Sequence, residues 1–365
     1  LVAIGVFAAI SFVNIGLVRA DIIYKQGQQF DSQKNWVNSV ELYRRALAAR
    51  ETEDHYMLFL GRALLEQAKA STATTEAVTF PEQPKLSDVL DLRPEQVGAM
   101  SQQQLLRAAE AVLLQAQRVN PLNTDHTANL ARLYRTWGDL SSADPALRQE
   151  MLDRSIAQYQ AAVMLSPQAA HLWNEMGNAR LARGERPEAE EAYTHSLALD
   201  PYFEQTYLLL SDFYDNDQRY AESAAMLEKG IAQITELRGI TSTLNLQSYL
   251  GVALSQSGDM TGAVEAMSTI VNLDPTNVGA LRNLGLLYRD AGQLEQAAAT
   301  VEQALALTPA EQTDQLGQLQ GVLLDVYQRL AADQPNDYRL PLALAQLLPQ
   351  QGQLSAALAP ARDGL

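Results

Sequence analysis

The chain has 365 residues, of which 47% are hydrophobic and none is cysteine, and its formal net charge is −16 at pH 7. The absence of cysteine excludes disulfide bonds, thiolate catalysis and cysteine-ligated metal centres. The excess of carboxylates argues against nucleic acid as a partner, because nucleic-acid binding needs a surface rich in lysine and arginine. The abundance of alanine, leucine and glutamine favours helices.

Residues 1–19 are predicted to form an apolar helix, since no charged side chain occurs before Arg19. Eighteen residues at about 1.5 Å per residue rise about 27 Å, just enough to cross the hydrocarbon core of a membrane. The glycine, serine and asparagine residues weaken such a span, and small residues suit contact with another helix. We expect residues 1–18 to anchor the chain in a membrane, with burial between subunits as the alternative.

A pattern of two helices is clearest over residues 172–201, LWNEMGNARLARGERPEAEEAYTHSLALDP. A leucine or methionine followed by glycine marks the first helix, a glycine marks the turn, and a proline follows the second helix. The same spacing recurs from residues 244 and 278, and less completely from residue 204, at a period of about 34 residues. Small residues such as Gly177 and Ala189 are expected to let the two helices approach closely.

The pattern divides the chain into units. Residues 20–123 are predicted to hold two helix pairs with an insertion at about 71–100, which contains a short helix near LSDVLDL. A capping box of Ser101 and Gln104 is expected to start the next helix. The remaining predicted parts are a third pair at 124–169 with an insertion at about 139–150, four regular pairs at 170–311, and an irregular helix with a truncated last pair at 312–365.

This pattern resembles the tetratricopeptide repeat. The resemblance implies an all-α solenoid, a right-handed superhelix of antiparallel helix pairs, here preceded by the apolar helix. It also implies a concave face that is lined by the first helices and binds a protein or peptide segment. A single pair cannot bury its own apolar face, so neighbouring pairs must stack.

Residues 1–70 carry a more specific resemblance. An apolar segment runs directly into VRADIIYKQGQQFD and then into WVNSVELYRRAL and EDHYMLFLGRALLEQA. This arrangement resembles the C-terminal end of bacterial O-antigen ligase/polymerase-like membrane proteins, in which a last membrane helix leads into an extracytoplasmic repeat domain. The resemblance implies a place in the bacterial cell envelope and an association with envelope polysaccharide. The multi-span catalytic part is absent, so no transfer activity is implied for any residue of this chain.

No motif for catalysis, metal binding or cofactor binding is found. The four histidines, His55, His126, His171 and His195, do not follow a metal-binding spacing. The glycines that recur with the repeat are expected to serve helix packing and not phosphate binding. The threonines of the insertion would suit O-linked glycan if the chain lies outside the cytoplasm.

Repeat phase predicts which side chains line the concave face. These are Asn129, Arg132, Arg135, Asn174, Asn178, Asp212, Asp215, Arg282 and Arg289.

The favoured function is therefore a non-enzymatic scaffold for protein–protein interaction, membrane-anchored at the bacterial envelope with its repeats outside the cytoplasm. One alternative is a self-assembling subunit of an extracellular filament, stacked through the apolar N-terminal helix and an uncapped last repeat. A second alternative is a regulatory part of an O-antigen ligase or polysaccharide polymerase.

Overall fold

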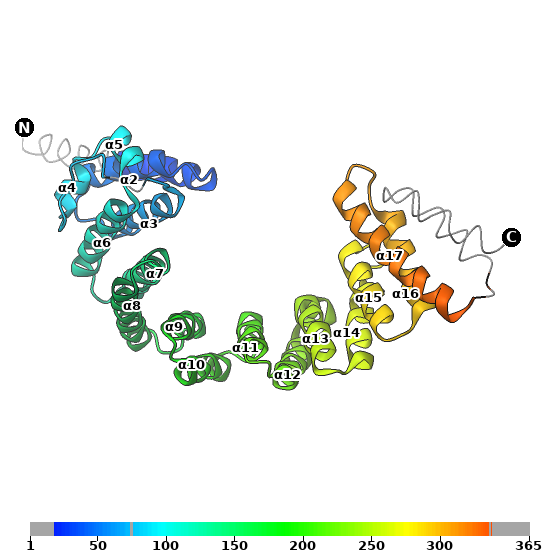
Figure 1. Cartoon of the computed structure of the whole chain (residues 1–365). Helices are drawn as coiled ribbons and strands as arrows, with labels where there is room; N and C mark the ends of the chain where they lie inside the picture. Colours follow the sequence, from blue (N-terminus) through cyan, green and yellow to red (C-terminus); the bar gives the residue numbers. More distant parts are fainter. Residues whose placement is uncertain (1–17, 74–75, 336, 338–365) are drawn as a thin grey trace, which may run out of the picture. The chain divides into compact units, whose positions relative to one another are not determined.

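The structure is a computed structural model that describes residues 18–73, 76–335 and 337, and the regular elements of these residues are all helices (Figure 1). Most of the predicted apolar helix and of the predicted last repeat lie outside the described residues. The chain forms two compact units, Leu1–Leu199 and Asp200–Leu365, called here the N-terminal and C-terminal units. Among the described helices, none is both long enough and apolar enough to cross a membrane.

The N-terminal unit consists of helices that pack in pairs, each with a first and a second helix. Residues 18–32 are helical and contact the second helix α2 (Trp36–Ala49). The later pairs are α3 (Asp54–Ala70) with α6 (Gln102–Val119), α7 (Thr124–Leu140) with α8 (Pro145–Leu165), and α9 (Ala170–Arg183) with α10 (Arg186–Leu199). Two short helices, α4 (Leu86–Leu90) and α5 (Pro94–Ala99), lie in the connection between α3 and α6.

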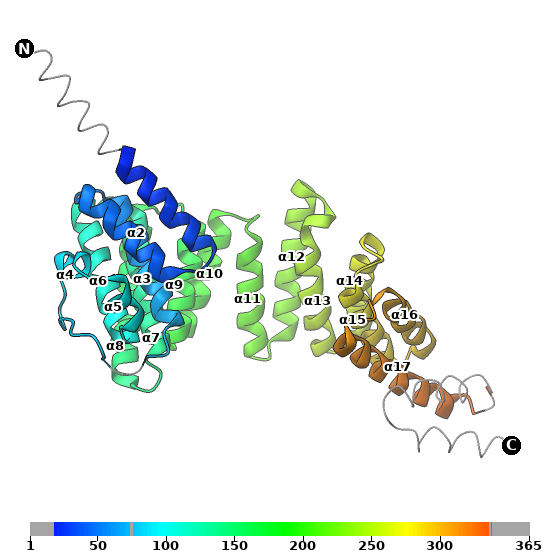
Figure 2. The same ribbon diagram turned by 90° about the horizontal axis from the view of Figure 1, so that it is seen from above.

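The C-terminal unit repeats the arrangement, and Figure 2 shows α11, α12 and α13 side by side. The pairs are α11 (Glu204–Asn216) with α12 (Tyr220–Arg238), α13 (Leu244–Ser257) with α14 (Met260–Leu273), and α15 (Val278–Asp290) with α16 (Leu294–Leu307). A 3-10 turn at Ile240–Thr243 precedes α13, and α17 (Thr313–Asp333) packs against α16. The expectation of an all-α array of helix pairs is confirmed.

A glycine at the eighth position of a first helix lies against a side chain of its partner helix. A Cβ atom added at Gly177 would lie 2.5 Å from Cε1 of Tyr193, and one at Gly285 would lie 2.5 Å from Cγ2 of Val301. Atoms at such distances overlap, so a larger residue there would push the helices apart. The predicted packing role of these glycines is confirmed.

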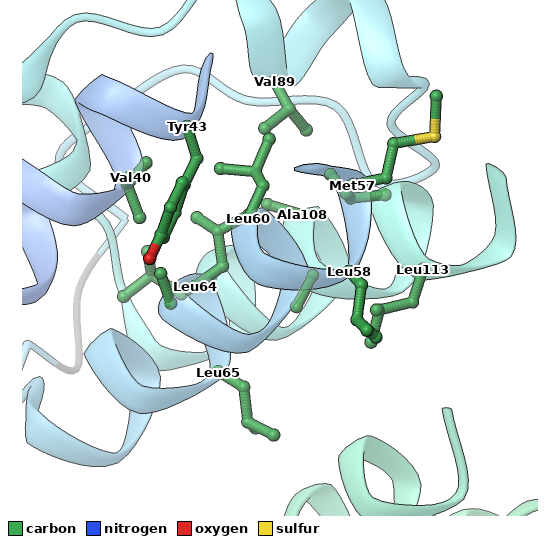
Figure 3. Close-up of a cluster of buried hydrophobic side chains, with 14 of the residues drawn as sticks. Val40, Tyr43, Met57, Leu58, Leu60, Leu64, Leu65, Val89, Ala108 and Leu113 are labelled. Atoms are coloured by element: carbon green, nitrogen blue, oxygen red, sulfur yellow. The ribbon is translucent and has the colours of Figure 1, made fainter. Parts of the chain in front are cut away.

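The core of the N-terminal unit joins consecutive pairs (Figure 3). Side chains of α2, α3 and α6 interdigitate there, and Tyr43, Leu60 and Leu113 are fully buried. Burial of such apolar surface, at about 25 cal/mol per Å², is the main stabilisation of a stacked helix array.

The insertion between α3 and α6 is docked on the second helices. Its buried Val89 and Val97 belong to the same core, and α4 and α5 both pack against α2. The amide nitrogen of Gln104 donates to the backbone oxygen of Val78 at 2.6 Å. The capping box is confirmed, because Ser101 and Gln104 bond reciprocally to each other's backbone N–H at 3.3 and 3.0 Å.

Residues 139–150 form no separate loop domain. Residues 139–140 complete α7, and α8 already begins at Pro145, capped by the side chain of Asp144. The extra residues therefore lengthen the helices of this pair.

Candidate functional site

A groove runs across the first helices of the N-terminal unit. Between α3 and α7 it has a volume of 660 Å³, and it is lined by side chains of these two helices and by Tyr159 of α8. A hollow of 520 Å³ shares Arg132, Arg135 and Tyr159 with it and continues onto α9. We call the two together the α3–α7–α9 groove.

The repeat explains which residues line this groove. Counted from the first residue of α3, α7 and α9, positions 6, 9 and 12 all face it, because steps of three residues stay on one side of a helix. The nine side chains are Phe59, Arg62 and Leu65 on α3, Asn129, Arg132 and Arg135 on α7, and Glu175, Asn178 and Leu181 on α9.

The structure places the predicted concave-face residues of this unit in two environments. Asn129, Arg132, Arg135 and Asn178 line the groove. Asn174 stands at position 5 of α9 and is only 3% exposed, whereas its neighbour Glu175 lines the groove. Sequence reasoning missed Glu175 and the whole contribution of α3. Counting positions 6, 9 and 12 from the first residue of each first helix identifies both Glu175 and the residues of α3.

Most charges in the groove are paired within it. Arg132 binds Glu175 through two hydrogen bonds, Nε to Oε2 and Nη2 to Oε1, each 2.8 Å long. Burial lowers the pKa of Arg132, but the bonds and charge of Glu175 outweigh this effect and raise it, so the guanidinium stays charged. This bidentate pair ties α7 to α9. Arg135 pairs through Nη1 with Oδ2 of Asp139, one turn further along α7.

Arg62 differs from these residues. Within the described part of the chain no carboxylate pairs with it, and its guanidinium carbon lies 5.2 Å from the ring centroid of Phe59. That ring is held by Tyr24, at 5.1 Å edge-on, and by His55, at 4.9 Å. A guanidinium over an aromatic ring keeps its N–H donors available to an incoming acceptor. One end of the groove therefore offers an accessible cation in a strongly acidic chain.

The two asparagines offer complementary hydrogen-bonding groups. The Asn129 amide nitrogen donates to the backbone oxygen of Asp125 at 2.7 Å, which leaves its Oδ1 to accept. The Tyr193 hydroxyl donates to Oδ1 of Asn178 at 2.7 Å, which leaves the amide N–H groups of Asn178 to donate. Together they can satisfy both the N–H and the C=O of a bound backbone.

His126 and His195 make contacts that join helices or pack rings together. His126 is fully buried, with Nε2 2.7 Å from Oδ2 of Asp54, so it joins α7 to α3. The ring of His195 packs 4.0 Å from that of Trp173. Across residues 18–73 and 76–335, no group of three histidine, aspartate or glutamate side chains is arranged to hold a metal ion.

The predicted residues of the C-terminal unit fall on α11 and α15. Arg282 donates to Oε1 of Gln318 at 3.2 Å, and Arg289 pairs with Asp290 at 2.7 Å and with Asp325 at 3.3 Å. Both arginines therefore link α15 to α17. Asp212 and Asp215 lie one turn apart on α11.

Comparisons with known proteins agree with this fold. Two family models described as tetratricopeptide repeat match residues 140–203 and 254–323. Protein O-mannosyl-transferase TMTC1 of Mus musculus is 29% identical over 212 residues, 52% of this chain and 22% of that protein. Its counterpart from Homo sapiens is 30% identical over 202 residues, 50% of this chain and 23% of that protein. The chain thus spans less than a quarter of the length of these relatives.

Among solved structures, the C-terminal part of a TPR repeat-containing protein from Cytophaga hutchinsonii matches with a TM-score of 0.51. The match covers 71% of this chain and 94% of that one at 13% identity. At this identity the match concerns the fold alone.

Proposed function

We propose, from the premise that the chain is a tetratricopeptide-repeat protein, that it is a non-enzymatic scaffold which holds a segment of another protein in the α3–α7–α9 groove. The observation that carries this proposal is the regular three-by-three set of side chains that line the groove. They expose an accessible cation, amide donors and acceptors, and apolar surface in one row of helices.

The dimensions suit an extended peptide. Neighbouring helices pack about 8–10 Å apart, so three first helices extend over about 16–20 Å. An extended chain rises about 3.3 Å per residue, which gives about six residues across the groove. The amides of Asn129 and Asn178 would bind the peptide backbone, and Arg62 would bind a carboxylate or a backbone carbonyl of the segment.

Selection of peptides from a random display library on the whole chain tests this proposal. We expect the selected peptides to bind Arg62→Glu at least about tenfold more weakly than the wild type, a loss of about 1.4 kcal/mol. Arg45→Glu is the matched control, since Arg45 is exposed on the second helix α2 and makes the same change of charge. Equal losses in both variants, or none in either, would contradict a binding site on the first helices.

For location, we propose the bacterial cell envelope, with residues 1–18 in the membrane and the repeats outside the cytoplasm. The support is the run of apolar residues in the sequence and the resemblance of residues 1–70. The full chain should sediment with membranes, and deletion of residues 1–18 should release it. Added protease should cut the repeats in intact spheroplasts. Resistance to the protease until the membrane is lysed would place the repeats in the cytoplasm instead.

A second candidate function is a non-catalytic part or partner of a glycan-transferring system, such as an O-antigen ligase or polysaccharide polymerase. It is favoured by relatives that are named O-mannosyl-transferases and extend far beyond the matched segment. Mild detergent extraction from the native host should then recover a multi-span membrane protein with the chain. Its recovery should be lost on deleting residues 1–18.

The filament alternative has support from exposed apolar side chains at and just after the C-terminal ends of the second helices α6 and α8. Leu122, in the turn after α6, is 79% exposed, and Met164, in the last turn of α8, is 83% exposed; Val119 and Leu165, which end these two helices, are exposed as well. Exposed apolar surface of this kind favours association between chains. Concentration-dependent filaments of the full chain that Met164→Asp abolishes would favour this candidate, and a monomer at all concentrations would exclude it.

A further inference from the structure

In the C-terminal unit, the face formed by the first helices carries side chains that differ from those of the α3–α7–α9 groove. Positions 6, 9 and 12 of its first helices are Leu209, Asp212 and Asp215 on α11, Tyr249, Val252 and Ser255 on α13, and Asn283, Leu286 and Arg289 on α15. Tyr249 is 39% exposed and Val252 is 53% exposed. Across the first helices from α3 to α15, strongly exposed large hydrophobic side chains occur on α13 alone. The two exposed apolar side chains of α13 set this face apart from the groove of the other unit, whose apolar side chains are less exposed.

An apolar notch lies between α13 and α15. It has a volume of 220 Å³, with Val252 and Leu286 on its sides and with Gly251 and Met267 also lining it. Met267 is buried and belongs to the core, so the notch extends the core to the surface. An apolar side chain from a partner would fill it and remove Val252 from water, at about 25 cal/mol per Å² of area buried.

Two carboxylates on α11, the helix next to α13, have no cationic partner among the described residues. Asp212 and Asp215 on α11 occupy the same positions as Val252 and Ser255 on the adjacent helix α13. In the described part of the chain neither carboxylate has a lysine, arginine or histidine partner, and the carboxylate of Asp215 accepts a single hydrogen bond, 3.5 Å long, from the hydroxyl of Ser211. Burial, and then the charge of Asp215, raise the pKa of Asp212. A cation brought by a partner would relieve this repulsion.

We propose that the face formed by α11, α13 and α15 is a second binding surface, which takes a polypeptide segment with a lysine or arginine beside Asp212 and Asp215 and a large apolar side chain in the notch. The spacing of the two side chains follows from the helices. The notch lies about one and a half helix spacings from α11, or about 12–15 Å. An extended segment covers this distance in about four residues.

This surface is independent of the α3–α7–α9 groove, because it lies wholly in the C-terminal unit and carries carboxylates where that groove carries Arg62. The two faces would select segments of opposite charge. Such a chain would bring two different protein segments together.

A peptide array on the full chain tests the proposal. Each 12-residue peptide carries one arginine and one leucine in a glycine and serine background, with the two separated by one to eight positions. We expect the strongest binding at a separation of about four and at least about tenfold less binding when the arginine is replaced by glutamate. A binding signal that does not depend on the separation would overturn the proposal.

Substitutions in the chain test separately the contact of the arginine with the two carboxylates and the contact of the leucine with the notch. Asp212→Asn with Asp215→Asn should weaken binding about tenfold, whereas Glu265→Gln, which removes an exposed carboxylate from the second helix α14, should leave it unchanged. Val252→Ser should weaken binding of the leucine peptide but not of its serine analogue. An equal loss with Glu265→Gln would mean non-specific attraction and would overturn the proposal. Arg62→Glu should have no effect here, which separates this test from that of the first groove.

Discussion

Single residues decide how closely the two helices of a pair approach. At position 8 the partner atom is 2.5 Å from an added Cβ at Gly177 but 3.4 Å away at Gly251, where the nearest atom is the flexible end of Met267. The ring of Tyr193 cannot move aside as easily, since it is buried and its hydroxyl is bonded to Asn178.

Gly177→Ala should therefore lower the free energy of unfolding by about 1–3 kcal/mol, as overpacking does. Gly251→Ala should be neutral or stabilise by up to about 1 kcal/mol, because alanine is the better helix former. Chemical denaturation of the two variants measures both effects. Equal destabilisation would mean that the two glycines pack alike.

The pair formed by the buried His126 and the half-buried Asp54 predicts that stability falls in acid. Burial alone would raise the pKa of Asp54, but hydrogen bonds from His126 and Asn120 outweigh it and hold the folded pKa below the unfolded value of 3.8. The stabilisation is then present above pH 3.8 and is lost as the pH falls through the folded pKa. The difference in unfolding free energy between the wild type and Asp54→Asn should shrink as the pH falls from about 4 through the folded pKa. A difference that stays constant over this range would contradict the account.

The repeat phase of the sequence predicts some of the groove residues and misses others, and the reason is physical. The repeat period gives the helical face only to within one residue, and one residue turns a side chain by about 100° around an α-helix. Asn174 and Glu175 are adjacent, yet only the glutamate lines the groove. Arg62 was missed because its pair is interrupted by the insertion, which weakens the repeat signal there.

At the scale of elements, the insertion of residues 71–100 acts as a brace on the second helices. Met100, at its end, is fully buried in the core that α2, α3 and α6 share. Arg44 of α2 donates to the backbone oxygen of Leu90, so the end of α4 is fixed as well. The sequence predicted the short helix and the capping box, because both are local patterns, but not the face on which the insertion docks.

Met100→Ala should lower the free energy of unfolding by about 2–4 kcal/mol through the cavity it leaves. Glu76→Gln removes a salt bridge to Arg107, but Glu76 is 53% exposed, so this control should cost less than about 1 kcal/mol. Chemical denaturation followed by circular dichroism measures both. A small effect of Met100→Ala would mean that the insertion is not part of the cooperative unit.

For the whole molecule, the repeat pattern was sufficient to predict an all-α array, since each pair buries its apolar face only against neighbouring pairs. The different chemistry of the two first-helix faces could not be predicted in the same way. It depends on exposure and on which charges are already paired: Arg132 pairs with Glu175, whereas Arg62 has no carboxylate partner among the described residues.

The central claim is that partners bind the first helices of the N-terminal unit. Photo-crosslinking in native cells tests it most directly, with benzoylphenylalanine placed at Lys69 in the groove or at Arg45 on the second helix α2. We expect one discrete crosslinked protein from Lys69, lost when Arg62→Glu is added, and none from Arg45. The same crosslinks from both positions, or a crosslink from Arg45 alone, would contradict the account.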